Sequence, residues 1–230
     1  MPIIKTLNHD FFATWSPAMA YVLGFFAADG NMIRNKRGAH FISFKITDLC
    51  ILEAMQKAMG SNHSIGTSNK VLEGQRAQYS LQLGSKKMFA DLKKLDMTPV
   101  KSATLHLPAV PEKYVGHFVR GYFDGDGCVY FASLKFRARK NPKWVLQTIF
   151  TCGNKTFLAQ LLTLLRRYGV RGGALRNKRR GYDLLLSQRD SLALYLLMYD
   201  TISAADIYLP RKYEKFRLAV ETMYPNAVVV

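Results

Sequence analysis

The stretch VLGFFAADG at residues 22–30 has a counterpart in the stretch VRGYFDGDG at residues 119–127. The two stretches start 97 residues apart, and each ends in an Asp-Gly pair. Apolar-periodic segments and turn residues follow both copies in the same order. A period of about 100 residues is far longer than a solenoid repeat. The chain is therefore predicted to be a duplicated domain, with one half at residues 1–109 and the other at residues 110–230.

Each half is predicted to contain the same run of elements, helix–strand–strand–helix–strand–strand–helix. Ser16 followed by Pro17 indicates the start of the first helix, because serine caps helix N-termini and proline suits the first helical position. Pro111 opens the equivalent helix of the second half, and residues 200–230 form a final connection and helix. Period-two alternation marks the strands, and apolar residues at helical spacing mark the helices. The expected helices are 17–28, 49–59, 86–95, 111–124, 155–168 and 189–199, and the expected strands are 31–37, 40–47, 64–71, 76–83, 128–139, 144–152, 170–177 and 181–187. Helices that back antiparallel strands place the chain in the α+β class.

The first helix of each half carries small residues at four-residue spacing. They are Ala20, Gly24 and Ala28 in one helix, and Gly121 and Gly125 in the other. Such spacing places them on one helix face, where two backbones can approach closely. Glycine costs about 1 kcal/mol in a helix interior, and a helix–helix contact would explain its use here. We therefore expect the two helices to pack together, with Asp29 and Asp126 side by side at their ends.

The charge of the chain indicates its partner class. The 230 residues include 33 Lys+Arg and 16 Asp+Glu, a formal net charge of +17, with 49% hydrophobic residues. That much apolar sequence excludes a disordered chain, and no apolar run is long enough to cross a membrane. The cations are spread along the chain rather than gathered in one amphipathic helix, which favours nucleic acid over a membrane surface. Three cysteines far apart argue against a disulfide framework and against a cysteine zinc site.

Polar side chains alternate with apolar ones along several expected strands. In the segment 134–139 three cations share one face, and in the segment 76–83 four polar side chains alternate in the same way. Arginine and glutamine recognise guanine and adenine edges, so such a sheet face can read bases in a major groove. The candidate DNA contacts are Arg34, Lys36, Lys45, Arg76, Gln78, Ser80, Gln82, Lys135, Arg137, Arg139, Gln147, Arg176, Lys178 and Arg180.

The two repeated stretches resemble the signature of the LAGLIDADG homing endonucleases, and the resemblance extends from about Phe11 to Tyr224. It implies the single-chain, two-motif type, in which pseudo-twofold halves form a saddle of antiparallel sheets over DNA and the two motif helices lie at the interface. It also implies that Asp29 and Asp126 bind metal, joined by the carbonyl groups of Ala28 and Gly125.

Further site residues follow from the same resemblance. The polar residue after the second strand of each half lies near the metals in this family, which points to Asp48 and Asn154. A basic residue that assists cutting corresponds to Lys101. The second half has Ser203 near the matching place, so the two active sites are expected to be asymmetric.

The activity implied by the resemblance is intron homing. The chain would be a monomer that uses two or more Mg²⁺ ions to cut both strands of a DNA target of roughly two helical turns, leaving short 3′ overhangs. Its location would be the cytoplasm, or an organellar matrix if the host gene is organellar. The alternatives are an intron RNA maturase, a relative that binds DNA without cutting, and a transcription regulator. Retention of both Asp29 and Asp126 favours cutting.

The Asp-Gly pairs have two other interpretations. Residues 124–127 (DGDG) resemble the start of a calcium loop, but no glutamate follows at the twelfth position. Asp-Gly is also a common turn sequence, although its occurrence in two matched copies favours a functional role.

Overall fold

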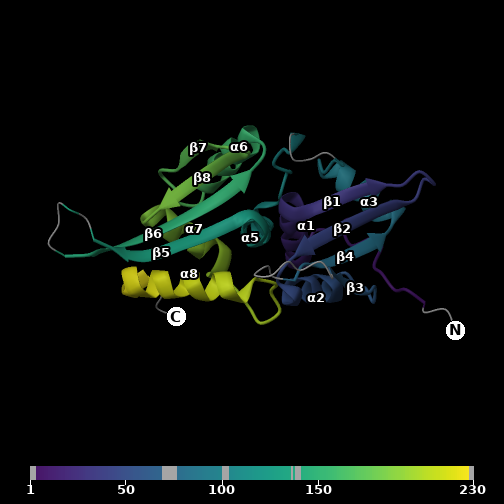
Figure 1. Cartoon of the computed structure of the whole chain (residues 1–230), viewed down its shortest axis with the longest axis horizontal. Helices are drawn as coiled ribbons and strands as arrows, with labels where there is room; N and C mark the ends of the chain where they lie inside the picture. Colours follow the sequence, from purple (N-terminus) through teal and green to yellow (C-terminus); the bar gives the residue numbers. More distant parts are fainter. Residues whose placement is uncertain (1–3, 69–76, 100–103, 136, 138–140, 228–230) are drawn as a thin grey trace. The chain divides into compact units, whose positions relative to one another are not determined.

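The computed structural model describes residues 4–68, 77–99, 104–135, 137 and 141–227 (Figure 1). The chain divides into two compact units. The first unit is Met1–Gly125 with Ala204–Leu209, and the second unit is Asp126–Ser203 with Pro210–Val230. The boundary predicted between residues 109 and 110 separates the two sequence repeats. It does not coincide with the bounds of the two compact units, and it stays a prediction.

The first unit contains one four-stranded antiparallel sheet of order β1-β2-β4-β3. Its strands are β1 (Gly30–Arg34), β2 (His40–Ile46), β3 (Ile65–Thr67) and β4 (Tyr79–Gly84). Its helices are α1 (Pro17–Asp29), α2 (Leu49–Ala58), α3 (Lys86–Lys94), the short 3₁₀ helix η1 (Glu112–Tyr114) and α5 (Val115–Asp126), of which only the final residue belongs to the second unit.

The second unit repeats the same topology with strand order β5-β6-β8-β7. Its strands are β5 (Gly127–Leu134), β6 (Lys143–Cys152), β7 (Ala174–Lys178) and β8 (Gly181–Ser187). Its helices are α6 (Lys155–Arg166), α7 (Arg189–Tyr199), α8 (Pro210–Met223) and the 3₁₀ helix η2 (Pro225–Ala227). The predicted α+β class and the αββαββα order of both halves are confirmed. No helix in the described part of the chain is long and apolar enough to cross a bilayer.

Side-chain caps fix where several helices begin. The Ser16 hydroxyl accepts a hydrogen bond from the Met19 N–H at 3.1 Å, and Ser85 accepts one from the Met88 N–H at 3.2 Å. Asn154 accepts from the Thr156 N–H at 2.8 Å at the start of α6. Each bond satisfies an N–H group that has no partner within the helix. The start predicted from Ser16 and Pro17 is confirmed.

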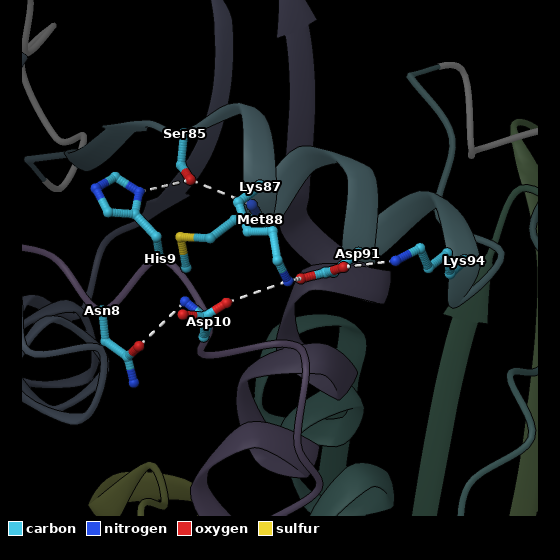
Figure 2. A network of polar contacts seen from close by, with 8 residues as sticks. All are labelled: Asn8, His9, Asp10, Ser85, Lys87, Met88, Asp91 and Lys94. Carbon is cyan, nitrogen blue, oxygen red and sulfur yellow. Dashed lines mark hydrogen bonds and ion pairs between the residues drawn. The ribbon is translucent and has the colours of Figure 1, made fainter.

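A polar network attaches the N-terminal segment to α3 (Figure 2). The His9 Nδ1 atom lies 2.8 Å from the hydroxyl of Ser85. Lys87 pairs with Asp10 at 3.2 Å and also with Asp91, which Lys94 contacts at 3.1 Å. Burial of Asp91 opposes ionisation, but the hydrogen bonds from the two lysines outweigh it and lower the pKa of this carboxyl group. Asp91 is therefore held as a buried carboxylate between two cations.

The helices α1 and α5 of the first unit are in direct backbone contact. A Cβ atom added to Gly24 would overlap the carbonyl oxygen of Phe118, and one added to Gly121 would overlap the carbonyl oxygen of Tyr21. Only glycine at both positions permits this approach. The predicted packing of the two helices through Gly24 and Gly121 is confirmed.

Each sheet has one buried face and one face that remains accessible. In the first unit Ile42, Phe44 and Leu81 are fully buried, and in the second unit Leu146, Phe150 and Leu184 are. Because side chains alternate along a strand, the residues between these point to the opposite face. That face is available for a partner in both units.

Several strands differ from their predicted bounds, β5 and β7 among them. The strand predicted at 128–139 ends at Leu134, which pairs with Lys143 of β6. The strand predicted at 170–177 starts only at Ala174. The residues just before β7 do not pair with β8 in the sheet. The Asp190 carboxylate instead accepts hydrogen bonds from the backbone N–H groups of Arg171 and Gly172 at 2.8 and 3.2 Å.

Candidate active site and nucleic-acid interface

The motif residue Asp29 is the last residue of α1, and its side chain is exposed. The next residue, Gly30, ends the helix by donating its N–H to the carbonyl group of Phe26 and then opens β1. A Cβ atom on Gly125 would stand 3.4 Å from the Asp29 carboxylate and would collide with the Cβ atom of Ala28. The last turn of α5 therefore passes directly beside Asp29 only because residue 125 is glycine.

Asp126 ends α5 as Asp29 ends α1, and β5 starts at the next residue. It is half-buried. The predicted metal ligands Asp29 and Asp126 therefore occupy equivalent places in the repeated topology. Ala28 and Gly125 precede them in the same helical turns, and metal binding by these four residues stays a prediction.

Asp124 is a second, buried carboxylate of the motif, and sequence reasoning assigned it no role. It is 1% exposed and accepts hydrogen bonds from the Tyr21 hydroxyl and from the Leu209 N–H, both at 2.8 Å. One bond connects α5 to α1, and the other connects α5 to the segment 204–209. Asp124 thus holds α1, α5 and the segment 204–209 together.

Arg120 lies one turn before Asp124 in α5 and also binds the segment 204–209. Its guanidinium group donates to the Ile207 carbonyl at 3.0 Å and to the Asp206 carboxylate at 2.8 Å. The His117 Nδ1 atom lies 2.9 Å from Arg120 and 3.0 Å from Asp206. Burial and the neighbouring Arg120 lower the pKa of His117, although Asp206 opposes this. The neutral ring can then accept from the guanidinium group.

Asp48 and Asn154 occupy equivalent positions after the second strand of each repeat. Each is the N-cap residue of the following helix, α2 or α6. The side-chain oxygen of Asn154 caps α6, whereas the Asp48 carboxylate makes no such cap and lies 3.5 Å from the hydroxyl of Thr47. The capping bond gives Asn154 a structural role, and its predicted part in catalysis stays a prediction.

The open face of the first sheet brings three predicted DNA contacts together. Lys45 pairs in register with Ser80, and Ser43 pairs with Gln82, so Lys45, Ser80 and Gln82 lie on one face of β2 and β4. Lys45 and Gln82 are exposed. Asn31 lies on this face as well because it pairs with Ser43; sequence reasoning missed it, although it alternates with the buried Met32.

Arg34 does not share that face. It pairs with His40 and alternates in phase with Met32, so it points to the helix side of the sheet. There it lines a cavity of about 410 Å³ with Lys86, Phe89 and Lys93. Lys36 lies in the turn between β1 and β2, and Gln78 precedes β4.

The open face of the second sheet carries a cross-strand polar network. Thr151 donates to the Asp183 carboxylate at 2.7 Å, and Lys178 pairs with the same carboxylate at 3.1 Å. Arg176 is in register with Asp183, and Gln147 lies on the same face because it alternates in phase with Thr151. Gln147, Arg176 and Lys178 therefore lie on one face of the second sheet, and their contact with DNA stays a prediction.

The remaining predicted contacts lie outside the strands or outside the described residues. Arg180 is in the turn between β7 and β8, and Lys135 and Arg137 follow the end of β5, so their predicted alternation on a strand is wrong. Arg76, Lys101 and Arg139 lie outside the described residues.

The donor set at the motif suits a hard divalent cation. Among the residues that the structure describes, no three His, Cys, Asp or Glu side chains form a cluster of the kind that encloses a metal. Mg²⁺ needs only one or two protein carboxylates, because water and substrate phosphate oxygens complete its coordination. Each motif by itself offers one carboxylate and an adjacent backbone carbonyl group of this kind.

Comparison with known proteins agrees with this arrangement. Residues 113–198 match the sequence model of the LAGLIDADG-like domain family. The whole chain is similar to the meganuclease I-SmaMI bound to uncleavable DNA, with 15% identity, 92% coverage of both chains and a TM-score of 0.61. The chain has the LAGLIDADG homing endonuclease fold.

Two further structures share this fold with the chain. I-AabMI bound to uncleaved DNA is 14% identical over 91% of this chain and 90% of its own, with a TM-score of 0.60. I-LtrWI bound to target DNA is 10% identical over 95% and 92%, with a TM-score of 0.58. I-SmaMI has also been crystallised on its uncleaved target in the presence of calcium ions. The sequence matches no curated protein. The segment that matches the family model contains α5, and α1 is its counterpart in the sequence repeat.

Proposed function

We propose that this chain is a site-specific DNA endonuclease that makes a double-strand break in a long target. The observation that carries the proposal is the pair of motif helices. The helices α1 and α5 touch through Gly24 and Gly121, and each ends in an aspartate at the start of a strand. A fold that merely bound DNA would not need an acidic residue at both helix ends, because carboxylates repel phosphate groups.

Mg²⁺ is the proposed cofactor, and two or more ions are expected. Asp29 and Asp126 would hold it with the carbonyl groups of Ala28 and Gly125, and Asp48 and Asn154 would lie near its hydration shell. When bound, the ion supplies activation of water and charge stabilisation at the scissile phosphate. The structure of I-SmaMI bound to its DNA target in the presence of calcium ions supports a divalent ion in this fold.

The chain's own residues would bind and orient the DNA. On the first sheet Lys45, Ser80 and Gln82 offer a cation and two hydrogen-bonding groups on adjacent strands. On the second sheet Gln147, Arg176 and Lys178 do the same. Arginine and glutamine would read base edges in the major groove, and the lysines would contact phosphates. Lys101 is proposed to stabilise charge during cutting.

The finer properties of the proposed enzyme come from the family resemblance. It would act as a monomer in intron homing, recognise roughly two turns of duplex DNA and leave short 3′ overhangs. The cytoplasm, or an organellar matrix, is its proposed location. An intron RNA maturase and a binding-only relative remain the competing functions, and the test below separates them.

The test is a cleavage selection on a randomised plasmid library with Mg²⁺. The wild-type protein is expected to cut one long site. Asp29→Asn and Asp126→Asn should lose double-strand cutting, because each removes a charged metal ligand, and should still bind the selected site in Ca²⁺. Asp96→Asn is the matched control, since this exposed residue has a φ of 62°, a conformation that asparagine tolerates.

Each outcome has a clear meaning. Full cutting by either motif variant would contradict the assignment of the aspartates. Tight binding to one site without cutting by the wild-type protein would support a binding-only relative. Tight binding to intron RNA alone would support a maturase.

A further inference from the structure

A row of four apolar side chains crosses the open face of the second sheet. Cys128 of β5 pairs in register with Ile149 of β6. Ile149 also pairs with Leu185 of β8, and Leu185 pairs with Ala174 of the edge strand β7. Figure 1 shows these four strands side by side. A free cysteine behaves as a small apolar side chain, so these four residues are called the apolar row.

The apolar row is accessible from outside the protein. Cys128 and Ala174 are exposed, Ile149 is half-buried and Leu185 is 9% exposed. Along β6, Ile149 precedes the fully buried Phe150, so it points away from the core. Contiguous apolar side chains that a fold leaves accessible mark a contact surface.

Polar side chains border the apolar row on both sides. On one side Thr151 is in register with Asp183, and Asp183 is in register with Arg176. On the other side Tyr130 pairs with Gln147. The apolar row is therefore a narrow strip between hydrogen-bonding groups. This pattern fits a ligand whose own apolar groups stand among polar ones, as the thymine methyl groups do in the major groove of DNA.

The equivalent row of the first sheet is polar. Asn31 and Cys128 each lie two residues after a motif aspartate. Asn31 pairs with Ser43, and Ser43 pairs with Gln82. The same place in the repeated topology thus carries hydrogen-bonding side chains in one unit and apolar side chains in the other. Because the topology accommodates both, the packing of the sheet does not dictate the apolar choice.

The two rows suit different bases. In the major groove, asparagine and glutamine side chains bind adenine, whereas apolar side chains contact the 5-methyl group of thymine. Guanine and cytosine present hydrogen-bonding groups at this edge. An apolar side chain that covers such a group leaves it without a partner, which is unfavourable.

We propose that the apolar row reads thymine, so that one half of the DNA target carries thymine at the base pairs that Ile149 and its neighbours cover. This inference rests on the proposed function for its ligand, which is duplex DNA. It gives a role in sequence specificity to residues that the pattern of polar side chains could not identify.

The test replaces thymine with deoxyuridine, which lacks only the 5-methyl group, in one half of the target at a time. The target is a duplex selected for binding in Ca²⁺, so its choice does not depend on cutting. In one half, the wild-type protein should bind about 4-fold more weakly for each methyl group that the apolar row contacts, the scale of losing one buried methylene-sized group.

Ile149→Ser shows whether the apolar row causes this methyl penalty. Serine is the residue at the equivalent place of the first sheet, Ser43, so the topology accommodates it. The variant should lose most of the penalty at the thymines concerned. Val145→Ser is the matched control, because Val145 is also half-buried on the same face of β6 but lies two rows away. It should keep the penalty at those thymines.

The double variant Cys128→Ser/Ala174→Ser provides a second route. Both residues are exposed, and the two changes add hydroxyl groups with little change of shape. Thermal unfolding checks that each variant is folded. The double variant should also reduce the penalty. A wild-type protein without a penalty, or a full penalty in the folded row variants, would overturn the proposal.

The binding readout separates this inference from the proposed function. A penalty that the row variants lose, without any DNA cutting in Mg²⁺, would retain thymine reading and reject the endonuclease. Cutting by a protein that shows no penalty would reject thymine reading alone. Failure of the wild-type protein to bind any duplex would reject both.

Discussion

Arg120 and Arg217 both pair with carboxylates, but their surroundings are opposite. The Arg120–Asp206 pair is buried, with side chains 3% and 10% exposed at an N···O distance of 2.8 Å. The Arg217–Glu221 pair is exposed, at 46% and 41%, with a distance of 2.7 Å. Geometry alone would rate the two equally. Burial decides their value, because removing one partner of a buried pair leaves an uncompensated charge.

We therefore predict that Arg120→Met lowers the free energy of unfolding by about 3–5 kcal/mol. The matched variant Arg217→Met should change it by less than about 1 kcal/mol, the usual value of an exposed pair. Urea unfolding of the two variants and the wild-type protein measures both changes. Equal losses would show that Arg120 does not anchor the segment 204–209.

At the residue scale, the matched positions of the motif aspartates at two helix ends could be predicted and the buried polar cluster could not. Asp29 and Asp126 stand at matched places in two repeated stretches, which is a signal within the sequence itself. Asp124 and Arg120 belong to the second stretch too, but their partners Asp206, Ile207 and Leu209 lie more than 80 positions further on. No local pattern connects residues so distant. Only the fold shows that these two side chains bind the returning chain.

At the element scale, the contact between α1 and α5 depends on two glycines. A methyl group on Gly121 would overlap the Tyr21 carbonyl oxygen, and backbone cannot move aside as a side chain can. Gly121→Ala should therefore lower the free energy of unfolding by about 1–3 kcal/mol or more, as overpacking does. Gly84→Ala is the control, because its added Cβ atom would meet only the Phe41 ring at 3.4 Å.

Thermal unfolding of the two glycine variants compares their stabilities directly. A stable Gly121→Ala protein with wild-type cutting would contradict the backbone contact. An equal loss in both variants would point to a general cost of replacing glycine.

Element boundaries were predictable where local chemistry sets them. Serine caps and Pro17 fixed the helix starts, and period-two alternation located the strands. β7 starts later than predicted for a physical reason. Gly173 adopts a φ of 100° and Asp190 binds the preceding backbone, so pairing cannot begin before Ala174. These long-range bonds leave no trace in the alternation of the sequence.

At the scale of the whole molecule, the net charge of +17 should govern binding to DNA. Each phosphate contact releases counterions from the DNA. A protein that contacts 6–10 phosphates is therefore expected to bind about 10³–10⁵-fold more weakly at 200 mM salt than at 50 mM salt. Titrations of the selected duplex in Ca²⁺ at several salt concentrations measure this slope. Lys178→Gln should reduce the slope by about 1. A salt-independent affinity would contradict phosphate contact.

The membership of the segment 204–209 in the first unit has a consequence for synthesis on the ribosome. Residues up to Gly125 of that unit are made early, but Arg120 and Asp124 receive their partners only when Asp206–Leu209 have been translated. At about 5–20 residues per second, translation of the 84 residues from 126 to 209 takes roughly 4–17 s. During that interval Arg120 lacks its bonds to Asp206 and Ile207, and Asp124 lacks its bond from Leu209. The nascent first unit therefore cannot reach its final stability before the second sheet has been synthesised.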